Sequence, residues 1–172
     1  YYNIRRISKI KHHLTSETSA KVINATVTTH LDYHNGLLLG LPNTAVHKLQ
    51  VAQNNAARLL TGAKYRDHIK PVLYHLHWLP VRQRITFKVM VTIHKTLHAT
   101  TAPAYLKELI TLYQPRRTLR SASDPWKLEV PRSSNKYGDR SLQVLSAKLW
   151  NDLPPELRAP MSQVTFKKKS KL

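Results

Sequence analysis

The chain has 172 residues, and its 28 Lys and Arg exceed its 9 Asp and Glu, which gives a formal net charge of +19. It contains no Cys, so disulfides, thiolate metal sites and cysteine nucleophiles are excluded. Hydrophobic residues make up 41% of the chain, enough for a packed core, and no apolar run approaches the ~20 residues that a membrane span needs. The chain starts at Tyr1 without a visible signal peptide, so we expect it to be a piece of a longer protein.

Apolar residues at steps of three and four predict helices through the first half of the chain. Gly40 and Pro42 are expected to break the second helix, and Gly62 is a natural stop for the third. The predicted helices of this half are, in chain order, 4–14, about 17–39, and one that is capped by Asn43 or Thr44 and ends at Gly62.

The second half continues with helical spacing, interrupted by a segment rich in Pro, Ser and basic residues. Its predicted helices are 69–76, 81–98, 103–110 and 139–153, followed by a lysine-rich amphipathic end at 163–172. Residues 113–138 are predicted to be an irregular basic arm in which 127–130 is extended. The fold class predicted is therefore mainly α, an irregular helical bundle with a basic arm and at most a short β element. The expected segments are 1–62, 63–112, 113–138 and 139–172.

The distribution of charge favours a polyanionic partner. Residues 64–98 carry +6, residues 116–140 carry +4 and residues 161–172 carry +4, and nearly neutral segments lie between them. Such alternation is expected when apolar helices form a frame and basic segments line a surface. Nucleic acid is the usual polyanion, because each contacted phosphate releases condensed counterions.

The candidate nucleic-acid-binding residues come from three basic clusters and one aromatic side chain. Arg84, Lys88 and Lys95 fall within about 40° of one another around a helix and form one stripe. Trp126 is the candidate for stacking on an unpaired base. The arm supplies Arg116, Arg117, Arg120, Arg132 and Arg140, and the tail supplies Lys167, Lys168 and Lys169.

Catalytic and metal chemistry are weakly supported. His30 and His34, and likewise His94 and His98, have the i, i+4 spacing that zinc can use, but neither pair belongs to an HExxH motif and no Cys is present. We interpret these histidines as structural or surface residues. The acids are scattered, with no paired aspartates for two Mg²⁺ ions and no nucleophile elbow or phosphate-binding loop. No catalytic residue, metal site or cofactor is predicted for this chain.

Eight stretches in register resemble one family over essentially the whole chain. They are YYNIRRISKIKHHL, THLDYHNGLLLGLP, KLQVAQNNAARLLTG, HIKPVLYHLHWLPVRQRITFKV, APAYLKELI, RTLRSAS, GDRSLQVLSAKLWNDLPPELR and FKKKSKL. Taken together, they resemble the C-terminal region of the reverse transcriptase protein of LINE-type non-LTR retrotransposons, of the jockey and chicken-repeat group.

The resemblance implies a parent protein with an endonuclease and an RNA-directed DNA polymerase upstream of this region. Residues 1–62 would then be thumb-like helices, and the remainder a C-terminal extension that holds template RNA and nascent duplex during target-primed reverse transcription. The implied partners are the element RNA, the target DNA and the upstream polymerase, with no membrane. Mg²⁺ is expected for that polymerase and not for this region, and the complex would be a ribonucleoprotein of the nucleus and cytoplasm.

Two alternatives from other classes remain open. In the first, the chain is a structural scaffold for the upstream polymerase and its charge serves solubility. In the second, it is an independent helical DNA-binding domain that reads duplex DNA with the helices on either side of Gly62. A metal hydrolase built on the histidine pairs is a more remote third reading.

Overall fold

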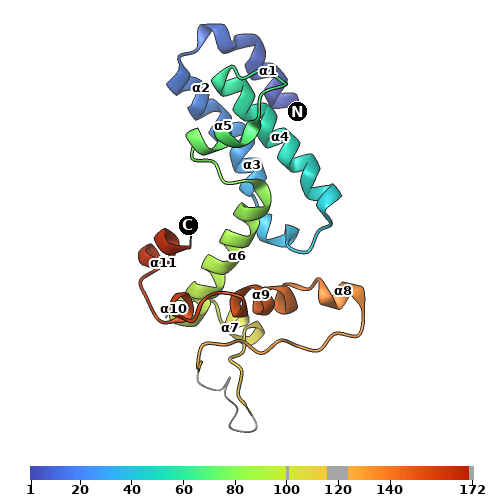
Figure 1. The fold of residues 1–172 in the computed structure, drawn as a ribbon, viewed down its shortest axis with the longest axis vertical. Helices are drawn as coiled ribbons and strands as arrows, with labels where there is room; N and C mark the ends of the chain where they lie inside the picture. The colour runs from blue at the N-terminus through green and yellow to red at the C-terminus, as the bar shows by residue number, and fades with distance from the viewer. Residues whose placement is uncertain (100, 116–123, 171–172) are drawn as a thin grey trace. The chain divides into compact units, whose positions relative to one another are not determined.

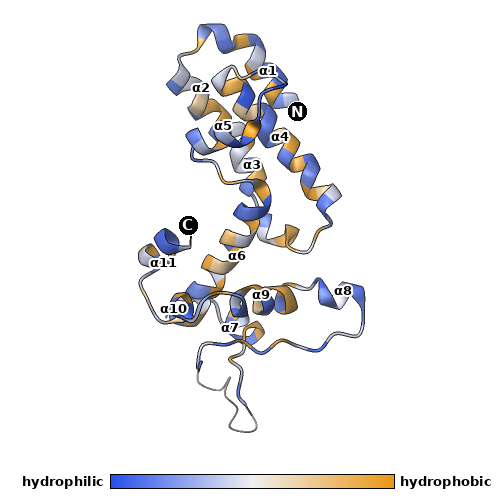
Figure 2. Cartoon of the chain, viewed as in Figure 1, coloured by the Kyte–Doolittle hydropathy of each residue, from blue (hydrophilic) through white to orange (hydrophobic). Residues whose placement is uncertain are grey.

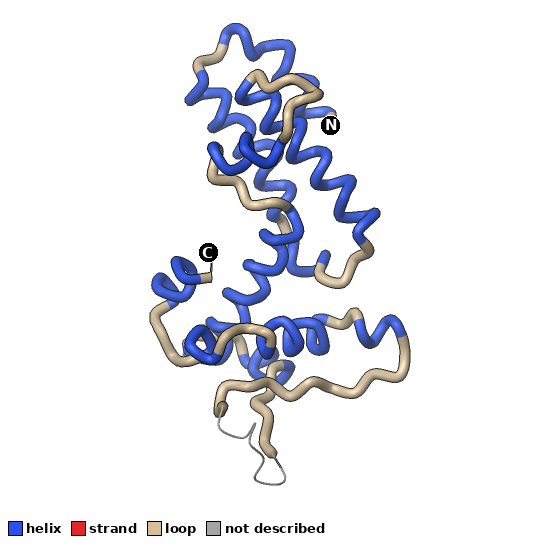
Figure 3. The backbone as a smooth tube through the Cα atoms, viewed as in Figure 1, coloured by secondary structure: helices blue, strands red, loops and turns tan. Residues whose placement is uncertain are grey.

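The structure is a computed structural model that describes residues 1–99, 101–115 and 124–170. It is mainly α-helical, which confirms the predicted fold class, and no strand is drawn within the described ranges (Figure 3). The chain divides into two compact units, residues 1–85 and 86–172, and the division falls within the long helix α6 (Figure 1).

The first unit is built from short and long helices that enclose two apolar clusters. One cluster centres on Ile7, Ile23 and Ala56, and the other on Val46 and Ile85. Both arise from helices with one apolar face each, so burying that face is what joins them. The helices are α1 (Tyr2–Ile10), α2 (Ser16–Ile23), α3 (Thr29–Asp32), α4 (Asn43–Thr61), α5 (Ile69–His75) and the beginning of α6 (Val81–His98).

The predicted second helix is wrong at its C-terminal end. Helical backbone runs from α2 through a π-helical turn at Asn24–Thr28 into α3, and it stops at Asp32 instead of continuing to Leu39. His34 then adopts a left-handed conformation with φ 49°, which no helix can contain. Asp32, the last residue of α3, is held by one local and one distant partner: Asn35, whose amide Nδ2 lies 3.4 Å from Asp32 Oδ1, and Arg84, 52 residues later in the chain.

The boundaries of α4 confirm one sequence signal and correct another. Gly62 ends the helix with φ 77°, as predicted, and its N–H donates to the carbonyl of Arg58 at 2.8 Å. At the start, the N-cap is Pro42 and no side chain caps the helix, so the predicted cap at Asn43 or Thr44 is wrong. The carbonyl of Pro42 accepts from the N–H groups of Ala45 and Val46 at 3.0 and 3.3 Å, so the backbone caps the first turn.

The described part of the second unit consists of the rest of α6 and five shorter helices. Between α7 and α8 the chain is extended, and an isolated antiparallel bridge joins Leu112 to Leu128, as expected for a short β element in 127–130. The helices are α7 (Ala104–Leu109), α8 (Lys136–Asp139), α9 (Leu142–Asn151), α10 (Pro155–Arg158) and α11 (Gln163–Lys169).

The predicted helix 139–153 begins three residues late because two separate caps lie before it. Asn135 caps α8 by accepting from the N–H of Gly138 at 2.6 Å, and Ser141 caps α9 by accepting from the N–H of Val144 at 3.4 Å. Asp139 is therefore the last residue of α8, and Arg140 is its C-cap. The rest of α9 keeps the predicted register and buries Trp150 completely.

Polar side chains tie the extended segment to α9 in the core of the second unit. Trp150 donates through Nε1 to the carbonyl of Trp126 at 2.8 Å. Asn151 accepts from the N–H of Leu128 and donates to its carbonyl, both at 2.9 Å. Such a two-way amide contact satisfies backbone groups that would otherwise be costly to bury. Arg158, only 4% exposed, forms an ion pair with Asp124.

Hydrophilic and hydrophobic residues are interspersed along most helices (Figure 2). In the described ranges, no helix combines the length and the hydropathy that crossing a bilayer requires.

Candidate nucleic-acid interface

A groove in the second unit brings together basic residues from two helices. It has a volume of about 510 Å³ and lies between α6, α7 and α11; we call it the lysine groove. Lys88 and Lys95 come from α6, and Lys167 comes from α11. The remaining lining residues are Phe87, Val91, Thr92, Thr96, Ala102, Pro103, Leu106 and Gln163.

Helix geometry and one buried ring place the three lysines together. Lys88 and Lys95 are seven residues apart, so they lie on one face of α6, about 10 Å apart along its axis. Lys167 follows Phe166, which is fully buried and stacks on His94 of α6 with ring centroids 4.3 Å apart. The Phe166 side chain therefore anchors α11 against α6 and sets the position of Lys167.

The electrostatics of the lysine groove favour an anion. None of its lining residues is acidic. Over the described ranges, the ion pairs are Lys21 with Glu17, Arg84 with Asp32, and Arg158 with Asp124, so the groove lysines take part in none of them. Lys88, Lys95 and Lys167 are all exposed, and long lysine stems can lie along apolar surface with the ammonium in solvent. Their charge is available to a ligand.

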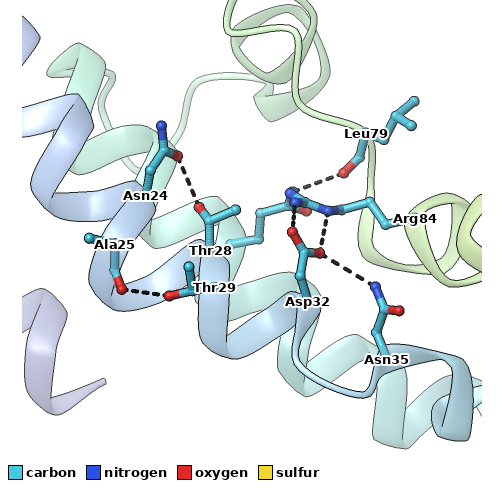
Figure 4. A network of polar contacts seen from close by, with 9 residues as sticks. Asn24, Ala25, Thr28, Thr29, Asp32, Asn35, Leu79 and Arg84 are labelled. Carbon is cyan, nitrogen blue, oxygen red and sulfur yellow. Dashed lines mark hydrogen bonds and ion pairs between the residues drawn. The ribbon is translucent and has the colours of Figure 1, made fainter.

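Arg84 does not line the lysine groove. In the first unit, its guanidinium forms a bidentate pair with Asp32, with Nε donating to Oδ1 at 2.9 Å and Nη2 contacting Oδ2 (Figure 4). The arginine side chain is only 18% exposed. Two parallel charge-assisted hydrogen bonds fix the orientation of the guanidinium relative to the carboxylate. Arg84 thus fixes the end of α3. The spacing of basic residues along α6 could not predict this role, because Asp32 lies 52 residues earlier in the chain.

The other predicted contacts are dispersed. Arg132 and Arg140 are exposed, as are Lys168 and Lys169 on α11, and none of the four lines the lysine groove. Arg116, Arg117 and Arg120 lie outside the described residues. The ring of Trp126 is partly buried and makes an edge contact with His98 at 4.6 Å between centroids, while its base-stacking role stays a prediction.

The two histidine pairs have different environments. His30 and His34 are exposed at the end of α3 and beyond it. His94 is 2% exposed, and neither ring nitrogen has a hydrogen-bond partner within the part of the chain that the structure describes. Burial, together with the neighbouring His98, lowers the pKa of His94 to about 4. Among the described residues, no group of three potential ligands could hold a metal ion.

His98 is part of the same packing. Burial lowers the pKa of His98, and a hydrogen bond with the carbonyl of Arg158, at 3.2 Å from Nε2, acts in the opposite direction. Both histidines are therefore favoured in the neutral form at neutral pH. Their role in this unit is to pack against aromatic rings, and they contribute no positive charge to the groove.

The sequence predicts a short basic loop after Gly62, in the first unit, but the candidate contacts include no residue of this loop. Arg58 of α4 holds this loop: it donates to the carbonyls of Lys64 and Asp67 at 3.3 and 3.4 Å, and its guanidinium lies 5.6 Å from the ring centroid of Tyr65. The loop thereby presents an 87% exposed tyrosine beside basic residues. The sequence AKYRDH at residues 63–68 already contains this pattern, because an aromatic residue interleaved with cations is typical of contacts to single strands.

Comparison with protein-family models, with curated proteins and with solved structures found no match to this chain.

Proposed function

We propose that the chain binds nucleic acid and that the lysine groove contacts its phosphates. The observation that carries this proposal is the convergence of Lys88, Lys95 and Lys167, from two helices, around one groove without an acidic lining residue. The net charge of +19 supports the same proposal by attracting a polyanion from a distance.

The groove lysines act as point charges, so they hold phosphates without reading base sequence. Binding is then driven by the release of counterions, and each neutralised phosphate adds to the salt dependence of the affinity. In the wider proposal, this surface belongs to the C-terminal region of a non-LTR retrotransposon reverse transcriptase and holds template RNA or nascent duplex. The eight resembling stretches support that context.

Fluorescence anisotropy of labelled strands tests the binding proposal. The probes are RNA and DNA of mixed sequence, titrated with the whole chain between about 50 and 200 mM salt. We expect log K to fall linearly with log salt, with a slope of about −2 or steeper if three phosphates are contacted. Absence of binding at the lowest salt concentration, or an affinity that does not change with salt concentration, would contradict the proposal and favour the alternative of a structural scaffold. Strong selectivity for one duplex sequence would contradict phosphate-only contact.

The transcript tests the wider context separately. We expect the reading frame upstream of Tyr1 to encode a polymerase with a YADD-type motif and, before it, an endonuclease. A short frame without that motif would contradict the assignment to a reverse transcriptase and leave the binding proposal to be judged by anisotropy alone.

A further inference from the structure

Apolar side chains line the lysine groove together with the three lysines. Val91 of α6 and Leu106 of α7 line it together with Pro103 and Ala102. The threonine hydroxyls offer little to a ligand, because Thr92 already donates to the carbonyl of Lys88 at 3.0 Å and Thr96 to that of Thr92 at 2.9 Å. We call the four residues Val91, Ala102, Pro103 and Leu106 the apolar floor; the lysines line the same groove.

Duplex and unpaired strands present different surfaces to such a floor. A duplex exposes phosphates and sugars and keeps the faces of its bases stacked inside, so it can use the lysines but gains nothing from the floor. An unpaired strand also exposes the apolar faces of its bases. Covering both the floor and the base faces removes apolar surface from water, which is favourable in proportion to the area covered.

We infer that the lysine groove selects an unpaired nucleic-acid strand over a duplex, with phosphates at Lys88, Lys95 and Lys167 and base faces on the apolar floor. The inference rests on the proposed function and specifies its ligand. The two α6 lysines lie about 10 Å apart along the helix axis, so both can contact phosphates of one short segment of strand. The amide of Gln163 adds an uncharged donor and acceptor at the same groove.

The experiment changes the floor and leaves the charges intact. Val91→Ser and Leu106→Ser make it polar, and Thr92→Val makes a neighbouring position apolar. Val164→Ser is the matched control, since this residue of α11 is 79% exposed and does not line the groove. Circular dichroism and thermal unfolding show which variants keep the fold. Because Thr92→Val should act in the opposite direction, damage to the fold cannot imitate the whole pattern.

Three probes of equal length separate the contributions of base and phosphate. They are an unpaired DNA strand, its duplex, and a strand in which the central nucleotides are abasic and retain every phosphate. We expect the serine variants to bind the unpaired strand about threefold to tenfold more weakly, with unchanged affinity for the duplex and the abasic strand. Thr92→Val should strengthen binding of the unpaired strand alone, and the salt slopes should not change.

The outcomes separate the inference from the function on which it rests. If the serine variants weaken all three probes equally, or leave the unpaired strand unaffected, strand selection is overturned, although binding by the lysines stands. If wild-type protein binds none of the probes, the proposed function itself has failed. An acidic amphipathic peptide can be titrated in the same assay. If the serine variants weaken only the binding of this peptide, the inference is also overturned, because the groove would then be a protein-docking site.

Discussion

The ring of His94 stacks on the ring of Phe166, with centroids 4.3 Å apart and ring planes 20° apart. Both side chains are buried, and the contact joins the C-terminal part of α6 to helix α11. Lys167, the next residue, lines the groove that also holds Lys88 and Lys95. One buried ring pair therefore connects the core of the second unit to the surface that we propose to bind nucleic acid.

Replacing Phe166 with alanine should release α11. Removal of a buried phenylalanine costs about 3–5 kcal/mol, and Phe166 is the one buried residue of the seven-residue helix α11. We expect a lower midpoint in denaturant unfolding and, under conditions where the rest folds, a salt slope reduced by the contribution of Lys167. Val164→Ala, which changes an exposed residue of the same helix, should alter neither. An unchanged unfolding midpoint in Phe166→Ala would show that α11 is not anchored by this ring.

Acid should destabilise the second unit through His94. Its pKa in the folded chain is lowered to about 4 by burial and by His98, so the unfolded chain binds the proton more readily. Stability is therefore greatest above the ordinary histidine pKa of about 6.5, and it falls as the pH drops from there towards 4. The lowering of this pKa from 6.5 to about 4 corresponds to a loss on the order of 3 kcal/mol attributable to His94.

Denaturant unfolding at several pH values, followed by tryptophan fluorescence, measures this loss. His94→Leu removes the titrating group with a similar volume, so its stability should depend less on pH over the same interval. His30→Leu, at an exposed position, serves as the control and should follow the wild type. Parallel pH curves for wild type and His94→Leu would contradict the assignment of this loss to His94.

The pair formed by Asp32 and Arg84 should stabilise the first unit without contributing to nucleic-acid binding. It is partly exposed, so we expect Asp32→Asn or Arg84→Gln to cost only about 1 kcal/mol. Arg84→Lys should not restore the loss, because an ammonium cannot make both parallel bonds. A double-mutant cycle measures the coupling. A fall in the salt slope for nucleic acid in Arg84→Gln would instead place Arg84 in the interface.

The amide of Asn151 should be required for the extended segment to pack. It exchanges two hydrogen bonds of 2.9 Å with the backbone of Leu128, which is buried. Asn151→Ala leaves a backbone donor and an acceptor without partners, so a loss of about 2–4 kcal/mol is expected. Amide hydrogen exchange at Leu128 should accelerate in this variant and remain slow in Lys148→Ala, an exposed change on the same helix. Unchanged exchange would show that the backbone bridge alone holds the segment.

Local patterns predicted the helices well and their partners poorly. The spacing of apolar residues and the stop at Gly62 gave α4 and α6 nearly as they are, because these helices bury one continuous face. The early end of α3 depends on Asp32 meeting Arg84, 52 residues later in the chain, and no local pattern contains that pairing.

The same distinction holds for the candidate interface. The stripe on α6 predicted Lys88 and Lys95 correctly as neighbours on one exposed face. It also included Arg84, which is committed to Asp32, and the sequence could not indicate that Lys167 joins the two α6 lysines. That position depends on Phe166 packing against His94, a contact between segments more than seventy residues apart.

The most direct test compares two triple variants that remove the same charge. In the first, Lys88, Lys95 and Lys167 of the groove are changed to Gln; in the second, Lys48, Lys70 and Lys148, which are exposed and do not line the groove, are changed to Gln. The measurement is the slope of log K against log salt for an unpaired strand. We expect the groove variant to lose about 2 units of slope and the control variant much less. Equal losses in both would show that the charge acts as a whole and that the lysine groove is not the binding site.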